Sequence, residues 1–225
     1  MVQEHLTVIQ GSGDGEELMA GNNGSNNNGN RNGASSSLEG LSEMAFEIAK
    51  RRQAAAVEVT EMLEEQYESW FGSHAATLLR AAAWLTGTSL YRSLDMTTDL
   101  EPGSAVLSDQ TDEEGLKLMK VFMLLVDKSG IKLKPNEYAE DIPPEQEPKK
   151  QILDVQRQFQ VEYNRIMKKY EFDFLEGAKT GAVACARLVR LHCENRKDVE
   201  AAIAASTISM GFVEGAKTVP APLKD

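Results

Sequence analysis

Histidine and cysteine are the side chains whose chemistry would suit metal binding or catalysis, and their spacing in this sequence argues against both. The histidines are His5, His74 and His192, and the cysteines are Cys185 and Cys193. Seven helical residues separate Cys185 from His192 by about 10 Å, too far for a shared zinc ion. The Glu-x-x-His spacing of di-iron sites in helical bundles does not occur in the sequence. We therefore predict no metal site and no cofactor.

Two other side chains are candidate functional residues because of their positions in the predicted helices. His74 lies at the junction of two predicted helices, where it would act as a ligand or base beside a nearby glutamate, or simply occupy a first helical turn. Glu162 falls near an apolar helical stripe, so burial would raise its pKa or require a cation such as Arg80 or Arg187. The alternative for Glu162 is a boundary position. No phosphate loop or nucleophile elbow accompanies them, so no catalytic residue is predicted and a protein that is not an enzyme is favoured.

The elements that would position these residues are helices. Apolar residues recur at helical spacing in six segments, and no sustained alternation indicates a strand, so the chain is predicted to be all-α. Ser73, Thr111 and Asp198 are the expected N-caps of the second, third and sixth helices. Gly130 is expected to end the third helix in the left-handed conformation. The predicted helices cover residues 41–71, 75–94, 112–128, 149–174, 176–193 and 199–217.

An apparent internal repeat relates two parts of this bundle. Residues 67–77 (YESWFGSHAAT) align with residues 170–180 (YEFDFLEGAKT), which predicts two related three-helix halves. The alternative is that two amphipathic helices each need aromatic anchors before a small-residue stretch. An Asn/Gly/Ser-rich stretch without apolar side chains is predicted to be disordered. The predicted divisions are a disordered tail (1–40) and a helical bundle (41–225), made of a first half (41–130), a Pro-rich connector (131–148) and a second half (149–225).

Small residues mark the surfaces where the second, fifth and sixth helices are expected to pack. Gly177 and Gly181 are one turn apart, as are Gly211 and Gly215, and small residues let helix axes approach closely. Glycine costs about 1 kcal/mol relative to alanine inside a helix, so these glycines predict closeness to another helix or to a ligand. The residues predicted to line a small-molecule pocket between the second and fifth helices are Arg80, Trp84, Gly177 and Gly181.

Charge and composition restrict the partners. The net charge of -11, from 35 acidic and 24 basic residues, disfavours nucleic acid and anionic membranes. No apolar run is long enough to span a bilayer, and the N-terminus lacks the pattern of a signal peptide. Two free cysteines suit a reducing compartment. We expect a cytoplasmic protein.

The leading functional prediction is a non-enzymatic bundle that acts through protein–protein interaction or self-association, as a homo-oligomer. This prediction rests on the long amphipathic first helix and on the absence of a recognisable catalytic motif in the sequence. The alternative is a small-molecule binding or sensor domain that uses the pocket between the second and fifth helices.

Overall fold

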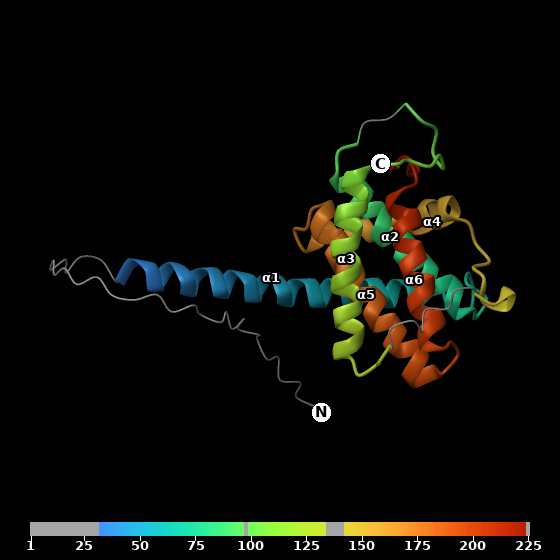
Figure 1. The fold of residues 1–225 in the computed structure, drawn as a ribbon, viewed down its shortest axis with the longest axis horizontal. Helices are drawn as coiled ribbons and strands as arrows, with labels where there is room; N and C mark the ends of the chain where they lie inside the picture. Colours follow the sequence, from blue (N-terminus) through green and yellow to red (C-terminus); the bar gives the residue numbers. More distant parts are fainter. Residues whose placement is uncertain (1–31, 97–98, 134–141, 224–225) are drawn as a thin grey trace, which may run out of the picture. The chain divides into compact units, whose positions relative to one another are not determined.

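The described part of the chain is built of helices (Figure 1). The computed structural model describes residues 32–96, 99–133 and 142–223, and the chain divides into two units, Met1–Leu41 and Ser42–Asp225. The described residues form six α-helices and no strand, which confirms the all-α prediction. The elements are α1 (Asn32–Glu64), α2 (Ala75–Ser93), α3 (Asp109–Lys128), the 3-10 turn η1 (Pro144–Gln146), α4 (Ile152–Lys169), α5 (Phe174–Arg190), the π-helical turn η2 (Leu191–Arg196) and α6 (Ala201–Ala216).

The first helix differs from its prediction at both ends. It begins at Asn32, before the predicted residue 41, and most of the predicted disordered tail lies outside the described residues. It ends at Glu64 rather than at residue 71. Beyond it the chain turns through Gly72 and Ser73, whose φ angles of 63° and 54° are left-handed and incompatible with a continuing helix.

Two of the expected N-caps, those of the third and sixth helices, are wrong. Ser108 caps α3 in extended conformation, whereas Thr111 is buried inside that helix. Glu200 occupies the N-cap position of α6, while the Asp198 carboxylate contacts His192. By contrast Gly130 has a φ of 99° directly after α3, which confirms its left-handed conformation.

Helix α2 also begins with a different cap. His74, not Ser73, is its N-cap residue, and the imidazole Nδ1 accepts a hydrogen bond from the Thr77 backbone N–H at 3.2 Å. This hydrogen bond satisfies one of the free N–H groups at the start of the helix.

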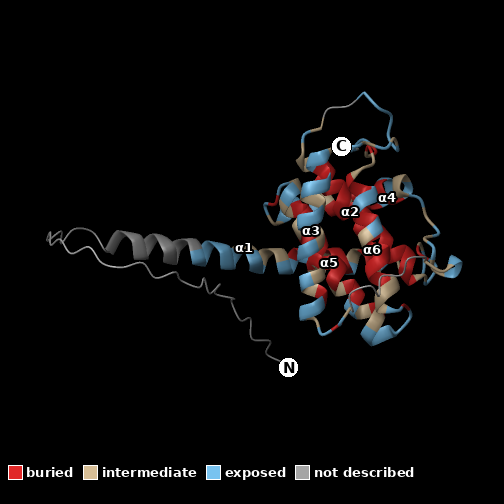
Figure 2. Cartoon of the chain, in the orientation of Figure 1, coloured by how far each residue is buried: buried red, intermediate tan, exposed pale blue. Residues whose placement is uncertain are grey.

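Helix α2 forms the centre of the bundle, buried along nearly its whole length (Figure 2). It crosses α6 at glycines. A Cβ atom on Gly215 would lie 2.5 Å from the Trp84 carbonyl oxygen, and one on Gly87 would lie 2.5 Å from the Phe212 carbonyl oxygen. Gly87 therefore serves close packing and does not end the helix, and the glycine spacing correctly predicted a close helix approach.

The helices of the two predicted halves pack on each other. Helix α2, from the first half, packs mainly against α6 and α5 of the second, and α3 packs against α5. An isolated antiparallel bridge between Ala105 and Thr218 adds a further link. The segments of the apparent repeat both connect a long helix to a small-residue helix, but duplication itself stays a prediction.

Candidate functional site

Two residues of the predicted small-molecule pocket, Arg80 and Trp84, bind a carboxylate of this chain. Glu214 Oε2 on α6 accepts hydrogen bonds from Arg80 Nη1 at 3.1 Å and from Trp84 Nε1 at 2.6 Å. Arg80 is only 3% exposed. Burial lowers the pKa of its guanidinium, and Glu214 opposes that change. This arrangement satisfies a buried cation with an internal partner.

The other two residues of that pocket lie against a different side of α2. A Cβ atom on Gly181 would lie 2.6 Å from the Tyr163 hydroxyl, and one on Gly177 would lie 3.3 Å from Met167 Cγ. The Tyr163 hydroxyl also donates to the Gly177 carbonyl at 2.7 Å. Side chains therefore fill the space beside both glycines. The structure does not bring the four residues together, and the small-molecule pocket remains a prediction.

His74 is held by backbone and a neighbouring hydroxyl, not by the glutamates considered from the sequence. Its Nδ1 lies 2.6 Å from Thr77 Oγ1, and its Nε2 lies 2.7 Å from the Glu145 carbonyl oxygen. Nδ1 thus caps the first turn of α2, and Nε2 fixes the start of this helix to the η1 segment. The contacts of His74 are those of a structural residue.

Glu162 lies in an open groove of about 630 Å³ between α1 and α4. Hydrogen bonds from Arg165 at 2.5 and 2.7 Å lower the pKa of its carboxyl group. The cation beside it is therefore Arg165, one turn along the same helix, and not Arg80 or Arg187. Glu162 is half-exposed, as expected for a boundary position.

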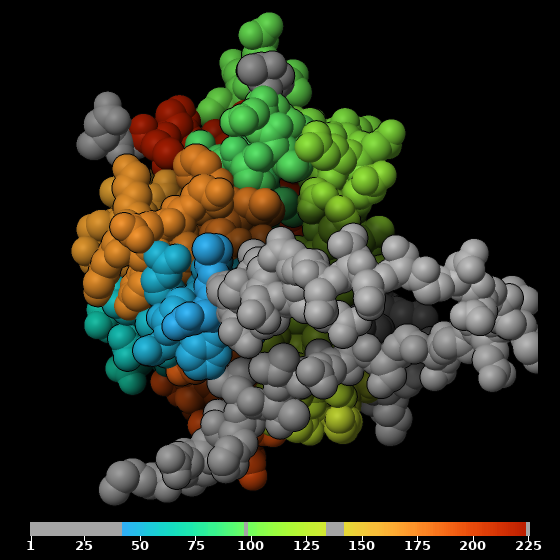
Figure 3. Space-filling view, turned by 90° about the vertical axis from the view of Figure 1, so that its left-hand side faces the viewer, coloured from blue at the N-terminus to red at the C-terminus, as the bar shows by residue number. Residues whose placement is uncertain are grey.

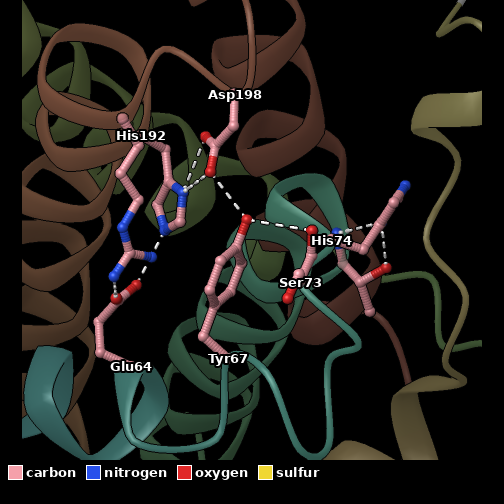
Figure 4. A network of polar contacts seen from close by, with 8 residues as sticks. Glu64, Tyr67, Ser73, His74, His192 and Asp198 are labelled. Carbon is pink, nitrogen blue, oxygen red and sulfur yellow. Dashed lines mark hydrogen bonds and ion pairs between the residues drawn. The ribbon is translucent and has the colours of Figure 1, made fainter.

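Sequence reasoning missed a network of polar contacts around His192 (Figure 4). The imidazole is fully buried. Its Nδ1 lies 3.0 Å from Asp198 Oδ1, and its Nε2 lies 2.8 Å from Glu64 Oε1. Arg196 pairs with the second oxygen of Glu64, and the Tyr67 hydroxyl donates to Asp198 Oδ2 at 2.8 Å.

Both ring nitrogens of His192 are occupied by contacts within this chain, because each lies against a carboxylate oxygen. Burial and the Asp198 carboxylate raise the pKa of Tyr67, which keeps its hydroxyl neutral. The ring of Tyr67 also lies close to both His192 and Arg196, with centroid distances of 5.0 Å to the imidazole and 4.6 Å to the guanidinium carbon.

The role that these contacts define is attachment of the end of α1. Glu64 is the last residue of α1 and Tyr67 follows it, whereas His192 and Arg196 belong to η2. The left-handed Lys197, with a φ of 57°, turns the chain so that Asp198 faces back toward His192. From sequence, the only available signal was the presence of a histidine beside charged residues, because Glu64 is 128 positions away.

Helix α1 also carries an apolar stripe that is only partly covered. Ala55, Val59 and Leu63 are at most 1% exposed and pack in the core. At helical spacings of seven and eleven residues before Ala55, the same stripe continues to Ile48 and Met44, but Met44 is 61% exposed. The first described side chains of α1 form a blue patch on the surface in Figure 3.

The boundary between the covered and uncovered parts of this stripe is marked by two arginines. Arg51 Nη1 lies 3.0 Å from Glu171 Oε2, and Arg52 Nη2 lies 2.5 Å from Glu176 Oε2 at the start of α5. These ion pairs hold α1 to the rest of its unit just beyond Ile48. The turn from Glu43 to Glu47 is exposed.

A second apolar feature is a hollow of about 230 Å³ between α3 and α6. Leu116 and Val213 line it and are 63% and 51% exposed. An ion pair of 2.5 Å between Lys217 and Asp112 lies at its edge. The other lining residues are Thr111, Gly115, Met119 and Ala216.

Comparison with known proteins identified no relative of this chain. No protein-family description, curated protein or solved structure matches it. Within the described ranges, no group of three or more histidine, cysteine, aspartate or glutamate side chains is placed to hold a metal ion. In the same ranges, no helix has the length and apolar character needed to cross a membrane.

Proposed function

We propose that this chain is a non-enzymatic interaction module that self-associates, with the first turns of α1 after residue 41 as its contact surface. The proposal rests on one observation. The apolar stripe of α1, which is buried at Ala55 and Val59, continues along the helix to residues that are exposed to solvent. Met44 is 61% exposed although it shares a helix face with Ala55 and Val59, which are buried. Covering such a stripe with another chain recovers about 25 cal/mol for each Å² of apolar surface removed from water.

The attachment of α1 supports this role. Its far end is tied to η2 through Glu64 and His192, and its middle is tied to α5 through Arg52 and Glu176. A contact surface on a helix fixed in this way loses little conformational freedom on association. Such pre-organisation strengthens binding without any additional contact.

A matched pair of substitutions on α1 tests the proposal. Met44→Glu places a charge in the stripe, whereas Phe46→Glu places one on the opposite side of the same helix, where Phe46 is similarly exposed at 57%. We expect Met44→Glu to weaken self-association at least about tenfold and Phe46→Glu to leave it near the wild-type value. Light scattering coupled to size-exclusion chromatography gives the comparison. Equal effects of the two substitutions would refute a role for the stripe.

A further inference from the structure

We infer that residues 103–106, together with Arg92 and Gln156, form a binding site for an extended, proline-containing peptide, which the chain's own segment after α6 occupies. This segment, residues 217–223, follows α6 directly and lies beside the loop that precedes α3 (Figure 1). The site shares no residue with the α1 stripe, so a failure of the proposed function leaves it untouched.

Backbone hydrogen bonds join the segment to residues 103–106. The Gly103 N–H donates to the Val219 carbonyl at 2.8 Å, and the Val219 N–H donates to the Ser104 carbonyl at 2.9 Å. The Val106 N–H donates to the Lys217 carbonyl at 2.7 Å. Pairing of main-chain groups in this way is a common means by which proteins bind extended peptides.

Two side chains of the bundle bind the next part of the segment, at Ala221. Gln156 Oε1 accepts a hydrogen bond from the Ala221 N–H at 2.8 Å, and Arg92 Nη2 donates to the Ala221 carbonyl at 2.6 Å. Gln156 is 2% exposed, and its Nε2 donates to Thr88 Oγ1 at 2.8 Å. Because this second contact fixes the amide group, its oxygen is oriented toward the segment, and such pre-organisation strengthens binding.

Side chains along the segment alternate between buried and more accessible positions. Val219 and Ala221 are each 7% exposed, whereas Pro220 is half-buried and Pro222 is exposed. Alternate residues of an extended chain face opposite sides, so the site accepts small apolar side chains at two positions. The N–H groups that it binds are those of residues 219 and 221. Proline, which has no N–H and a fixed φ angle, therefore fits at the positions between them and reduces the entropy lost on binding.

The segment is buried without being part of the main core. The apolar core cluster of the described residues includes Ala216, the last residue of α6, but neither Val219 nor Ala221. Release of the segment therefore exposes little of the core. It leaves the Gln156 amide oxygen and the Ser104 carbonyl without their partners, and buried polar groups without partners cost free energy. A vacant site thus favours another peptide of the same shape.

Binding of a labelled peptide tests the site in the full chain. Val219→Pro/Ala221→Pro removes two N–H donors from the segment and should vacate the site, while circular dichroism checks that the helices remain. By fluorescence anisotropy, a labelled peptide of residues 217–225 (KTVPAPLKD) should bind this variant at least about tenfold more tightly than the wild-type chain, whose own segment blocks the site. A control peptide with the same two prolines should bind at least about tenfold more weakly. A folded variant that binds both peptides equally, or neither, would overturn the inference.

Hydrogen exchange of the wild-type chain tests the separation of segment and bundle without any variant. We expect the amide hydrogens of Val219 and Ala221 to exchange at least about tenfold faster than those of α2. Their rates should be nearly independent of urea below the unfolding transition, because local opening exposes little surface. If these amides exchange at the rate of the α2 amides and with the same urea dependence, the segment leaves only when the bundle unfolds, and the inference is wrong.

Discussion

His192 Nε2 lies 2.8 Å from Glu64 Oε1, a contact that joins a fully buried imidazole on η2 to the last residue of α1. Because Asp198 lies 3.0 Å from the other ring nitrogen, the same ring also holds the chain before α6. The end of α1 and the chain before α6, which are distant in the sequence, thus meet at one side chain on η2. This convergence explains how α1 is fixed to the helices that follow.

Replacing His192 with leucine should therefore cost stability. It removes the ring that contacts both carboxylates, of which Glu64 is only 15% exposed, and puts an apolar side chain in the buried place of a polar one. We expect the free energy of unfolding to fall by about 2–3 kcal/mol in urea denaturation. The control His74→Ala removes an N-cap and should cost about 1 kcal/mol. Equal losses for the two histidines would contradict the distinct role of His192.

The glycine crossing between α2 and α6 predicts an unusually sensitive position. In Gly215→Ala, the added methyl group would lie 2.5 Å from the Trp84 carbonyl oxygen, and backbone on both sides cannot yield without shifting a helix. We expect a loss of at least about 2 kcal/mol. Gly115 in α3 is the matched control, because nothing lies within 4 Å of its added Cβ. Gly115→Ala should stabilise by about 0.5–1 kcal/mol, and destabilisation by Gly115→Ala alone would contradict the account.

The Glu214 carboxylate should matter more than a typical surface charge. Glu214→Ala leaves the buried guanidinium of Arg80 and the indole N–H of Trp84 without their shared acceptor. Because Glu214 is itself 45% exposed, solvent replaces part of the lost interaction, and we expect a cost of about 1–3 kcal/mol. Glu171→Ala, which breaks the exposed pair with Arg51, should stay within about 0.5 kcal/mol of wild type. Thermal unfolding that ranks the two variants in the opposite order would refute this assignment.

The lowered pKa values of Glu58 and Glu176 predict loss of stability in acid. Hydrogen bonds from Lys169 and Tyr170 lower the pKa of Glu58. Burial acts to raise the pKa of Glu176, but the side chains of Lys179 and Arg52 outweigh burial and lower it. A folded pKa below the unfolded one gives stability that is present above the ordinary glutamate pKa of about 4.3 and is lost as pH falls through the folded value.

A pH series of melting temperatures checks this expectation. The double variant Glu58→Gln/Glu176→Gln should lose less stability than wild type between about pH 5 and pH 3. Glu65→Gln/Glu68→Gln, at two exposed carboxylates, should follow the wild-type curve and controls for the change in net charge. Parallel curves for wild type and the double variant would show that these two pairs do not contribute.

The spacing of residues in the sequence correctly predicted the features of the fold that depend on steric limits at single residues. The glycine positions in α5 and α6 indicated close helix contacts, and Gly130 was correctly expected to end α3, because both depend on steric limits at the residue itself. One failed cap, Asp198, has a distant partner, because it accepts a hydrogen bond from Tyr67, 131 positions away. Local spacing cannot predict such a contact.

The candidate site was harder to predict for the same reason. Arg80, Trp84 and Gly181 were placed on the correct helices, but which side of α2 each one meets depends on the crossing of whole helices. The apolar stripe of α1 was visible from its periodicity. The stripe is covered by the rest of the chain as far as Arg52. That limit depends on the position of Glu176 in the folded chain.

Sedimentation equilibrium of the wild-type chain tests self-association most directly. Over concentrations from about 1 to about 100 µM, where contacts of about 5–8 kcal/mol become populated, the weight-average mass should rise from the chain mass of 24.7 kDa toward twice that value. The Met44→Glu chain should remain at the lower mass across the same range. A wild-type mass that stays at 24.7 kDa at every concentration would contradict the account.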